Sequence, residues 1–136
     1  MKVEAPIHLR VEMPLFSKAR PRLGRDRKTG QPTVHMPGAY RTNQTKMRML
    51  LRHQWKGGLL EGPLCLYLRV GGEGRGDLDN IAGAFMDAAA DILWKDDRCG
   101  TICELAIQWE KKPKAESYWD VTIRPPFLAQ LELPLF

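Results

Sequence analysis

Apolar and polar residues alternate in two stretches of the chain, Ile7–Met13 and Leu64–Val70, and two further stretches near the C-terminus are also predicted to be β-strands. A period of two places successive side chains on opposite faces of a strand, so each alternating stretch would bury one face and expose the other. In the first stretch, for example, Leu9 and Val11 would point inward while His8 and Arg10 point outward. The predicted strands are Ile7–Met13, Leu64–Val70, Thr101–Trp109 and Tyr118–Ile123.

Two other stretches repeat apolar residues every three or four positions, which predicts amphipathic helices. The first spans Asn43–Trp55, with Thr42 or Asn43 as its cap and Gly57-Gly58 as its stop. Its expected buried residues are Met47, Leu50, Leu51 and Trp55. The second helix has Asp79 or Asn80 as a candidate cap. Its apolar stripe consists of Ile81, Ala84, Phe85, Ala88 and Ile92.

These elements follow one another as β-α-β-α-β-β. This order predicts an α+β fold, in which two main helices pack on a mixed β-sheet of about four strands. A chain of 136 residues suits one domain with a real core. We expect that domain to span residues 1–124, and we expect residues 125–136, which open with Pro125-Pro126, to form a separate tail.

Composition places the chain among ordinary globular proteins, with 43% hydrophobic and 27% charged residues. No apolar run approaches membrane length and no secretory signal is present, so we expect a cytoplasmic protein with no membrane contact. Cys65, Cys99 and Cys103 are an odd number without CxxC spacing, which argues against disulfides and structural zinc.

Charge is distributed unevenly along the chain. Residues 1–58 contain 13 Lys and Arg against 3 Asp and Glu, a net +10, whereas residues 59–136 contain 8 against 13, a net −5. A basic half beside an acidic half is typical of a protein that attracts a polyanion and places a metal on it. Segregation that serves only solubility is the alternative.

The most basic stretch is Ser17–Lys28, with six cations in twelve residues. Pro21, Gly24 and Gly30 argue against a regular element there, and Thr29–Pro32 is predicted to turn. Guanidinium groups suit phosphate oxygens, so we interpret the stretch as a DNA-backbone clamp, the alternative being a solvated loop. The expected DNA-binding residues are Lys18, Arg20, Arg22, Arg25, Arg27, Lys28, Arg48, Arg52 and Arg75.

Two pairs of carboxylates flank the second predicted helix. Asp77 and Asp79 precede it, and Asp96 and Asp97 follow it. Converging carboxylates repel one another unless a cation lies between them, and hard oxygen ligands suit Mg²⁺. We therefore predict a Mg²⁺ site, although one capping Asp and three solvated loop charges would give the same pattern.

The same residues resemble a known family. Gly76-Asp77-Leu78-Asp79-Asn80, Ala84–Ala88 and Trp94–Asp97 are similar to the core motif of the RusA family of Holliday junction resolvases. The resemblance implies a small homodimeric, Mg²⁺-dependent endonuclease that nicks four-way DNA junctions and leaves 5′-phosphate and 3′-hydroxyl ends. It also implies that Asp77, Asp79 and Asp97 are the essential carboxylates, with Asp96 beside them.

One position departs from the family pattern. The resemblance implies a catalytic lysine four residues after Asp79, where this chain has Gly83. A lysine there would lie on the same helix face as Asp79. Lys95, next to the second acidic pair, is the nearest replacement in the sequence.

The final residues form a second recognisable motif. Gln130, Leu131, Leu133, Leu135 and Phe136 match the anchor positions of the bacterial sliding-clamp binding motif, which the peptide resembles. Such peptides dock apolar anchors in a preformed groove. The tail is therefore predicted to bind the clamp; packing on its own domain or in a dimer would bury it equally well.

Three functions compete at this stage. The first is a junction-resolving endonuclease in recombination and repair. The second is a weakened nuclease that binds junctions at the clamp, a reading that Gly83 favours. The third is a Mg²⁺-dependent enzyme acting on nucleotides or another small phosphorylated ligand, against which the basic stretch and the tail argue.

Overall fold

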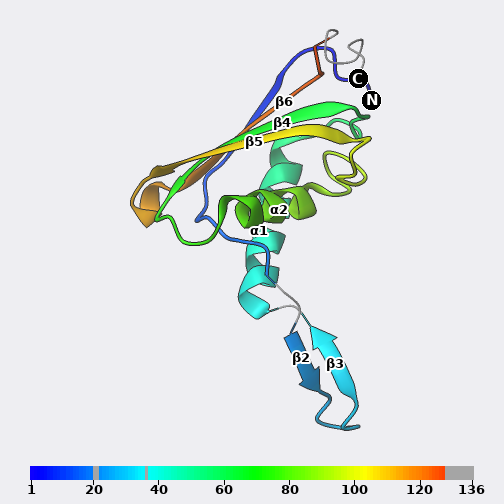
Figure 1. Ribbon diagram of the computed structural model, residues 1–136, viewed down its shortest axis with the longest axis vertical. Coiled ribbons are helices and arrows are strands. Elements are labelled where there is room, and N and C mark those ends of the chain that lie inside the picture. Colours follow the sequence, from blue (N-terminus) through cyan, green and yellow to red (C-terminus); the bar gives the residue numbers. More distant parts are fainter. Residues whose placement is uncertain (20–21, 36, 128–136) are drawn as a thin grey trace, which may run out of the picture.

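A four-stranded sheet with both helices on one face forms the body of the computed structural model (Figure 1), which describes residues 1–19, 22–35 and 37–127. The sheet order is β1-β6-β4-β5; only β4 and β5 run parallel, and the other neighbours are antiparallel. This arrangement confirms the predicted α+β fold. The elements are β1 (Ile7–Val11), β2 (Arg22–Arg25), β3 (Pro32–His35), α1 (Gly38–Gln54), β4 (Leu64–Gly72), α2 (Leu78–Ala89), β5 (Ile102–Lys111), the short 3₁₀ turn η1 (Lys114–Glu116) and β6 (Tyr118–Arg124).

Alternation along β1, β4 and β6 creates the core, whereas β5 leaves Leu105 and Trp109 exposed. Leu9 pairs with Val121 and Leu68 pairs with the same residue from the other side, so one apolar row crosses three strands. All three side chains are buried. Their sequence neighbours His8, Thr122 and Tyr67 form the matching row on the opposite, polar face.

Helix α2 is attached to the sheet through aromatic contacts. The Phe85 ring stacks on Trp119 of β6 at a centroid distance of 6.2 Å and meets Trp94 edge-on at 6.3 Å. All members of the predicted apolar stripe are buried, including Ile92 in the turn beyond the helix. A buried aromatic side chain contributes about 1.5–3 kcal/mol, so these contacts hold α2 in one orientation on the sheet.

The two helices begin earlier than the sequence predicts. Helix α1 starts at Gly38 after Pro37, five residues before Asn43, because the buried Tyr40 extends its apolar face by a turn. Thr42 and Asn43, the predicted caps, therefore lie inside the helix, and Pro37 occupies the N-cap position. Helix α2 starts at Leu78 with Asp77 at its N-cap, in place of Asp79 or Asn80.

The basic stretch contains a regular element, contrary to our expectation. Strands β2 and β3 pair antiparallel from Arg22 opposite His35 to Arg25 opposite Pro32, and the hairpin projects beyond the end of α1 (Figure 1). The residues interpreted as breakers are compatible with it. Gly30, at φ +70°, closes the turn by donating its N–H to the carbonyl of Asp26 at 2.8 Å, and Pro32 begins a strand.

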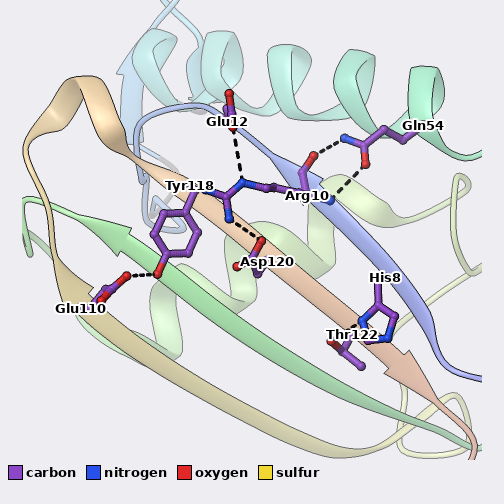
Figure 2. Close-up of polar contacts among 8 residues, drawn as sticks. All are labelled: His8, Arg10, Glu12, Gln54, Glu110, Tyr118, Asp120 and Thr122. Carbon is purple, nitrogen blue, oxygen red and sulfur yellow. Dashed lines mark hydrogen bonds and ion pairs between the residues drawn. The ribbon is translucent and has the colours of Figure 1, made fainter.

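Helix α1 also protects the free edge of β1. The side-chain amide of Gln54 accepts from the Arg10 N–H at 3.0 Å and donates to the Arg10 carbonyl (Figure 2). The Arg10 guanidinium lies 4.4 Å from the Tyr118 ring centroid and donates to Asp120 at 2.8 Å. Because Gln54 occupies both backbone groups of Arg10, another chain cannot pair with the edge strand at this residue.

The sequence predicts no disulfide bond and no membrane-spanning segment. All three cysteines are free, and burial raises the pKa of the Cys65 thiol to about 12. Among the described residues, no helix is long and apolar enough to cross a bilayer. The cytoplasmic location stays a prediction.

Candidate active site

Asp77 and Asp79 lie at the exposed start of α2. The loop before them turns at Gly74 and Gly76, whose φ angles of +85° and +91° favour glycine. Both carboxylates are exposed, and neither makes a hydrogen bond or ion pair within the described part of the chain. The free N–H groups of the first helical turn favour negative charge there, so the two ionised carboxylates are tolerated without a protein cation.

The second acidic pair precedes β5. Asp96 is half-buried, and its Oδ1 accepts from the Arg98 N–H at 3.2 Å and from the Thr101 hydroxyl at 3.3 Å. Asp97 is exposed and has no polar partner among the described residues. Asp96 therefore shapes the loop, while Asp97 is available to a ligand.

One chain does not bring the two pairs together. Asp77 follows the Gly72 end of β4, whereas the Asp96 loop lies at the opposite end, where the Leu64 N–H donates to the Thr101 carbonyl at 2.7 Å. Nine residues of strand span about 30 Å. Within the described ranges, accordingly, no three His, Cys, Asp or Glu side chains form a group that could hold one metal ion.

The segment after β1 crosses the start of α2 at close range. The Lys18 N–H donates to the Asn80 carbonyl at 2.8 Å. A Cβ added to Gly76 would lie 2.1 Å from the Ser17 hydroxyl oxygen, and one added to Gly72 would lie 2.8 Å from Leu15. Glycine is thus required where the two segments touch.

Lys18 continues along the outer face of α2. Its side chain covers Gly83, where an added Cβ would be 3.5 Å from the lysine Cδ. Its ammonium group ends 3.3 Å from Oδ2 of Asp87, one turn further along the helix. The Tyr40 hydroxyl donates to the same oxygen at 3.3 Å. Burial and the Asp87 charge raise the Tyr40 pKa to about 12, so this hydroxyl stays protonated at neutral pH.

The predicted cations occupy different settings. Arg48 extends from α1 to the end of α2, where its Nη1 donates to the carbonyls of Ala88 and Ala90 at 2.9 and 2.8 Å. This contact caps α2, a structural role that the basic stripe did not suggest. The other predicted cations that can be placed are exposed: Arg25, Arg27, Lys28, Arg52, Arg75 and Lys95. Arg20, the Arg22 side chain and the tail anchors lie outside the described residues.

A family model corresponds to most of this chain. The model described as endodeoxyribonuclease RusA matches residues 12–124, from the residue after β1 to the end of β6. The chain belongs to the RusA family. It is therefore an endodeoxyribonuclease, a hydrolase that resolves Holliday junctions in recombination and repair. No curated protein matches the chain at a significant level.

Nucleases of the RusA family are metal-dependent. The donors available here suit a hard cation, because Asp77, Asp79 and Asp97 offer carboxylate oxygens without competing protein partners in the described part of the chain. Sequence reasoning missed Asp87, which pairs with Lys18, and Tyr40, which donates a hydrogen bond to Asp87. The spacing of Asp79, Gly83 and Asp87, each four residues apart, was the available signal for Asp87.

The capping role of Arg48 is testable. Arg48→Ala leaves the Ala88 and Ala90 carbonyls without their donor, so the free energy of unfolding should fall by about 1–3 kcal/mol. Arg52→Ala, an exposed arginine one turn later, is the matched control and should change it by less than about 0.5 kcal/mol. Urea denaturation measures both. Equal stability of the two variants would contradict the cap.

Proposed function

We propose that the chain cuts four-way junctions as a homodimer with Mg²⁺, and that each active site combines Asp77 and Asp79 of one copy with Asp97 of the other. One observation carries this proposal: Asp77 and Asp79 lie at one end of β4 and Asp97 lies at the other. All three are exposed and have no polar partner among the described residues. A two-fold dimer places complementary ends of its two copies side by side and repeats the arrangement twice.

The residues at such a site have distinct tasks. The three exposed carboxylates would hold the ion, which when bound supplies electrostatic stabilisation to the scissile phosphate. Asp96 orients the loop that carries Asp97 through its bonds to Arg98 and Thr101. The α2 N-terminus fixes Asp77 and Asp79 on a rigid element, which keeps the reacting groups aligned. Two sites related by a two-fold axis suit paired, symmetric nicks in a two-fold junction.

The β2–β3 hairpin is the proposed DNA-binding arm. It projects from the body and carries exposed Arg25, Arg27 and Lys28 near its tip. No ion pair is formed by these three side chains within the described residues. Cations without protein partners release counterions when they meet phosphate, which makes binding strong and salt-dependent.

Asp79→Asn tests the acidic site. Cleavage of a labelled four-way junction in Mg²⁺ should fall by about 100-fold or more, because the metal contributes several kcal/mol to charge stabilisation. Junction affinity in EDTA should persist. Asp91→Asn is a matched control: Asp91 is exposed with φ +65°, a conformation that asparagine accepts. Undiminished cleavage by the Asp79 variant would overturn the assignment.

Subunit mixing tests whether the sites are shared. Asp79→Asn and Asp97→Asn dimers should each be inactive, but a mixed dimer contains one site with both native carboxylates. Co-refolding the two variants should therefore restore single nicks, up to about one quarter of native activity for random pairing. No recovery from verified mixed dimers would place each site within one copy, and a light-scattering mass of one chain would exclude the dimer.

Neutralising the hairpin should weaken binding to all DNA. Arg25→Gln with Arg27→Gln should reduce the slope of log affinity against log salt concentration by about 2, because two phosphate contacts are lost. Lys2→Gln with Lys56→Gln removes the same charge from exposed positions elsewhere. Fluorescence anisotropy with duplex and junction measures the slopes. Equal slopes for both double variants would refute the arm.

We also propose that residues 128–136 recruit the enzyme to a bacterial sliding clamp, on the strength of the motif at Gln130–Phe136. Leu135→Ala with Phe136→Ala should abolish binding to purified clamp in surface plasmon resonance, because the apolar anchors are lost. Junction cleavage should be unchanged. A changed molecular mass with clamp binding retained would instead assign the tail to the dimer interface.

A further inference from the structure

Lys18 occupies the helix surface that a side chain at position 83 would cover. Its backbone is fixed to the first turn of α2 through the Asn80 carbonyl, and its Cβ and Cδ lie 3.8 and 3.5 Å from the Cβ position at Gly83. These are ordinary van der Waals distances, so the lysine stem lies flat on the glycine. A cation from the N-terminal segment thus runs along the row of α2 that begins at Asp79.

The ammonium group of Lys18 is held loosely. The Lys18 side chain is 52% exposed and that of Asp87 is 32% exposed. A solvent-exposed ion pair of this kind contributes little free energy, so another anion can replace Asp87 at small cost. The flexible four-carbon stem can also redirect its charge without moving the backbone. A DNA phosphate at the start of α2 would therefore compete well with Asp87.

We propose that Lys18 is the phosphate-binding cation of the acidic site, and that Asp87, which also accepts from the Tyr40 hydroxyl, holds its ammonium group until DNA binds. This inference rests on the proposed function of Asp77 and Asp79. In the reaction, a water oxygen bonds to phosphorus and gives up one proton to solvent while the bond from phosphorus to the 3′ oxygen breaks. The 3′ oxygen leaves with the bonding electron pair and takes up a proton from solvent to become the 3′-hydroxyl. Lys18 forms no covalent bond and transfers no proton; its charge stabilises the negative oxygens of the transition state.

Lys95 fits this role less well. It lies next to Asp96, in the loop at the far end of β4 from Asp77 and Asp79, and among the described residues no hydrogen bond or ion pair links it to α2. Lys18, by contrast, contacts both the first turn of α2 and Gly83. Lys18 is therefore the better candidate, because it lies closer than Lys95 to Asp77 and Asp79 in the fold although it is more distant from them in the sequence.

The decisive experiment is rescue by relocating the lysine. Lys18→Ala should lower single-turnover junction cleavage in Mg²⁺ by about 100-fold, the loss typical of one transition-state donor. Adding Gly83→Lys to this variant should recover tenfold or more, because the ammonium group again lies on the same helix face. Adding Gly83→Ala is the matched control and should recover nothing. Native cleavage by Lys18→Ala would overturn the proposal.

A second measurement needs no catalysis. Lysine acetylation should be followed by mass spectrometry in EDTA, with and without uncut junction DNA. Lys18 should become protected on junction binding, and Asp87→Asn should increase its reactivity in the free protein. Unchanged Lys18 reactivity on DNA binding would contradict the proposed phosphate contact.

Three further outcomes separate this inference from the function on which it rests. If Asp79→Asn abolishes cleavage while Lys18→Ala cuts normally, the acidic site stands and only the lysine assignment fails. If Lys95→Ala causes the 100-fold loss in place of Lys18→Ala, the cation comes from the second acidic loop. If Asp79→Asn itself cuts normally, the acidic site fails independently of Lys18.

Discussion

The stacking of Phe85 on Trp119 is the contact on which the site depends. It fixes α2 against the middle of the sheet, between the Trp94 turn at one end and the glycine loop at the other. Because β4 and β5 are parallel, the chain must return along the sheet between them, and α2 makes this return. Its N-terminus therefore emerges beside the end of β4. Burial of the apolar face leaves Asp79, Gly83 and Asp87 on the outer row, where an anionic site is accessible to DNA.

Close packing against α2 also explains why the cation proposed for the site, Lys18, is distant in the sequence from the carboxylates at the start of α2. The segment carrying Leu15 and Ser17 can approach only because Gly72 and Gly76 have no side chains. The same approach places Lys18 on Gly83. A longer side chain at position 83 and a lysine lying over it would compete for one surface. The glycine that looked like a loss of catalytic charge is therefore compatible with a cation delivered by the N-terminal segment.

Periodicity predicted the parts of this fold that depend on one buried face. Strand β4 buries the apolar face that the sequence indicates, and the stripe containing Phe85 and Ile92 is buried throughout, whereas β5 leaves Leu105 and Trp109 exposed. Periodicity did not predict the features that depend on tertiary packing. The start of α1 depends on the burial of Tyr40, and the hairpin depends on pairing across Gly30, which a reading of glycine as a breaker excludes. For the site, the sequence identified the family, and the roles of the acidic residues stay a prediction. The sequence placed the two acidic pairs on either side of α2, but it did not indicate that the parallel β4–α2–β5 connection keeps them from sharing one metal ion within a chain, or that Arg48 caps α2.

This separation has a consequence for how cutting is controlled. A metal site assembled within one chain would act on any DNA that reached it. If the ion instead requires Asp79 from one copy and Asp97 from another, a lone chain has no complete site, and activity depends on dimer formation. Both sites then exist together or not at all, which suits a reaction in which a single unpaired nick would leave the junction unresolved. In the resting protein Lys18 is paired with Asp87, so charge neutralisation at each site would also await the phosphate. Metal, partner and substrate would thus each supply what one isolated chain lacks.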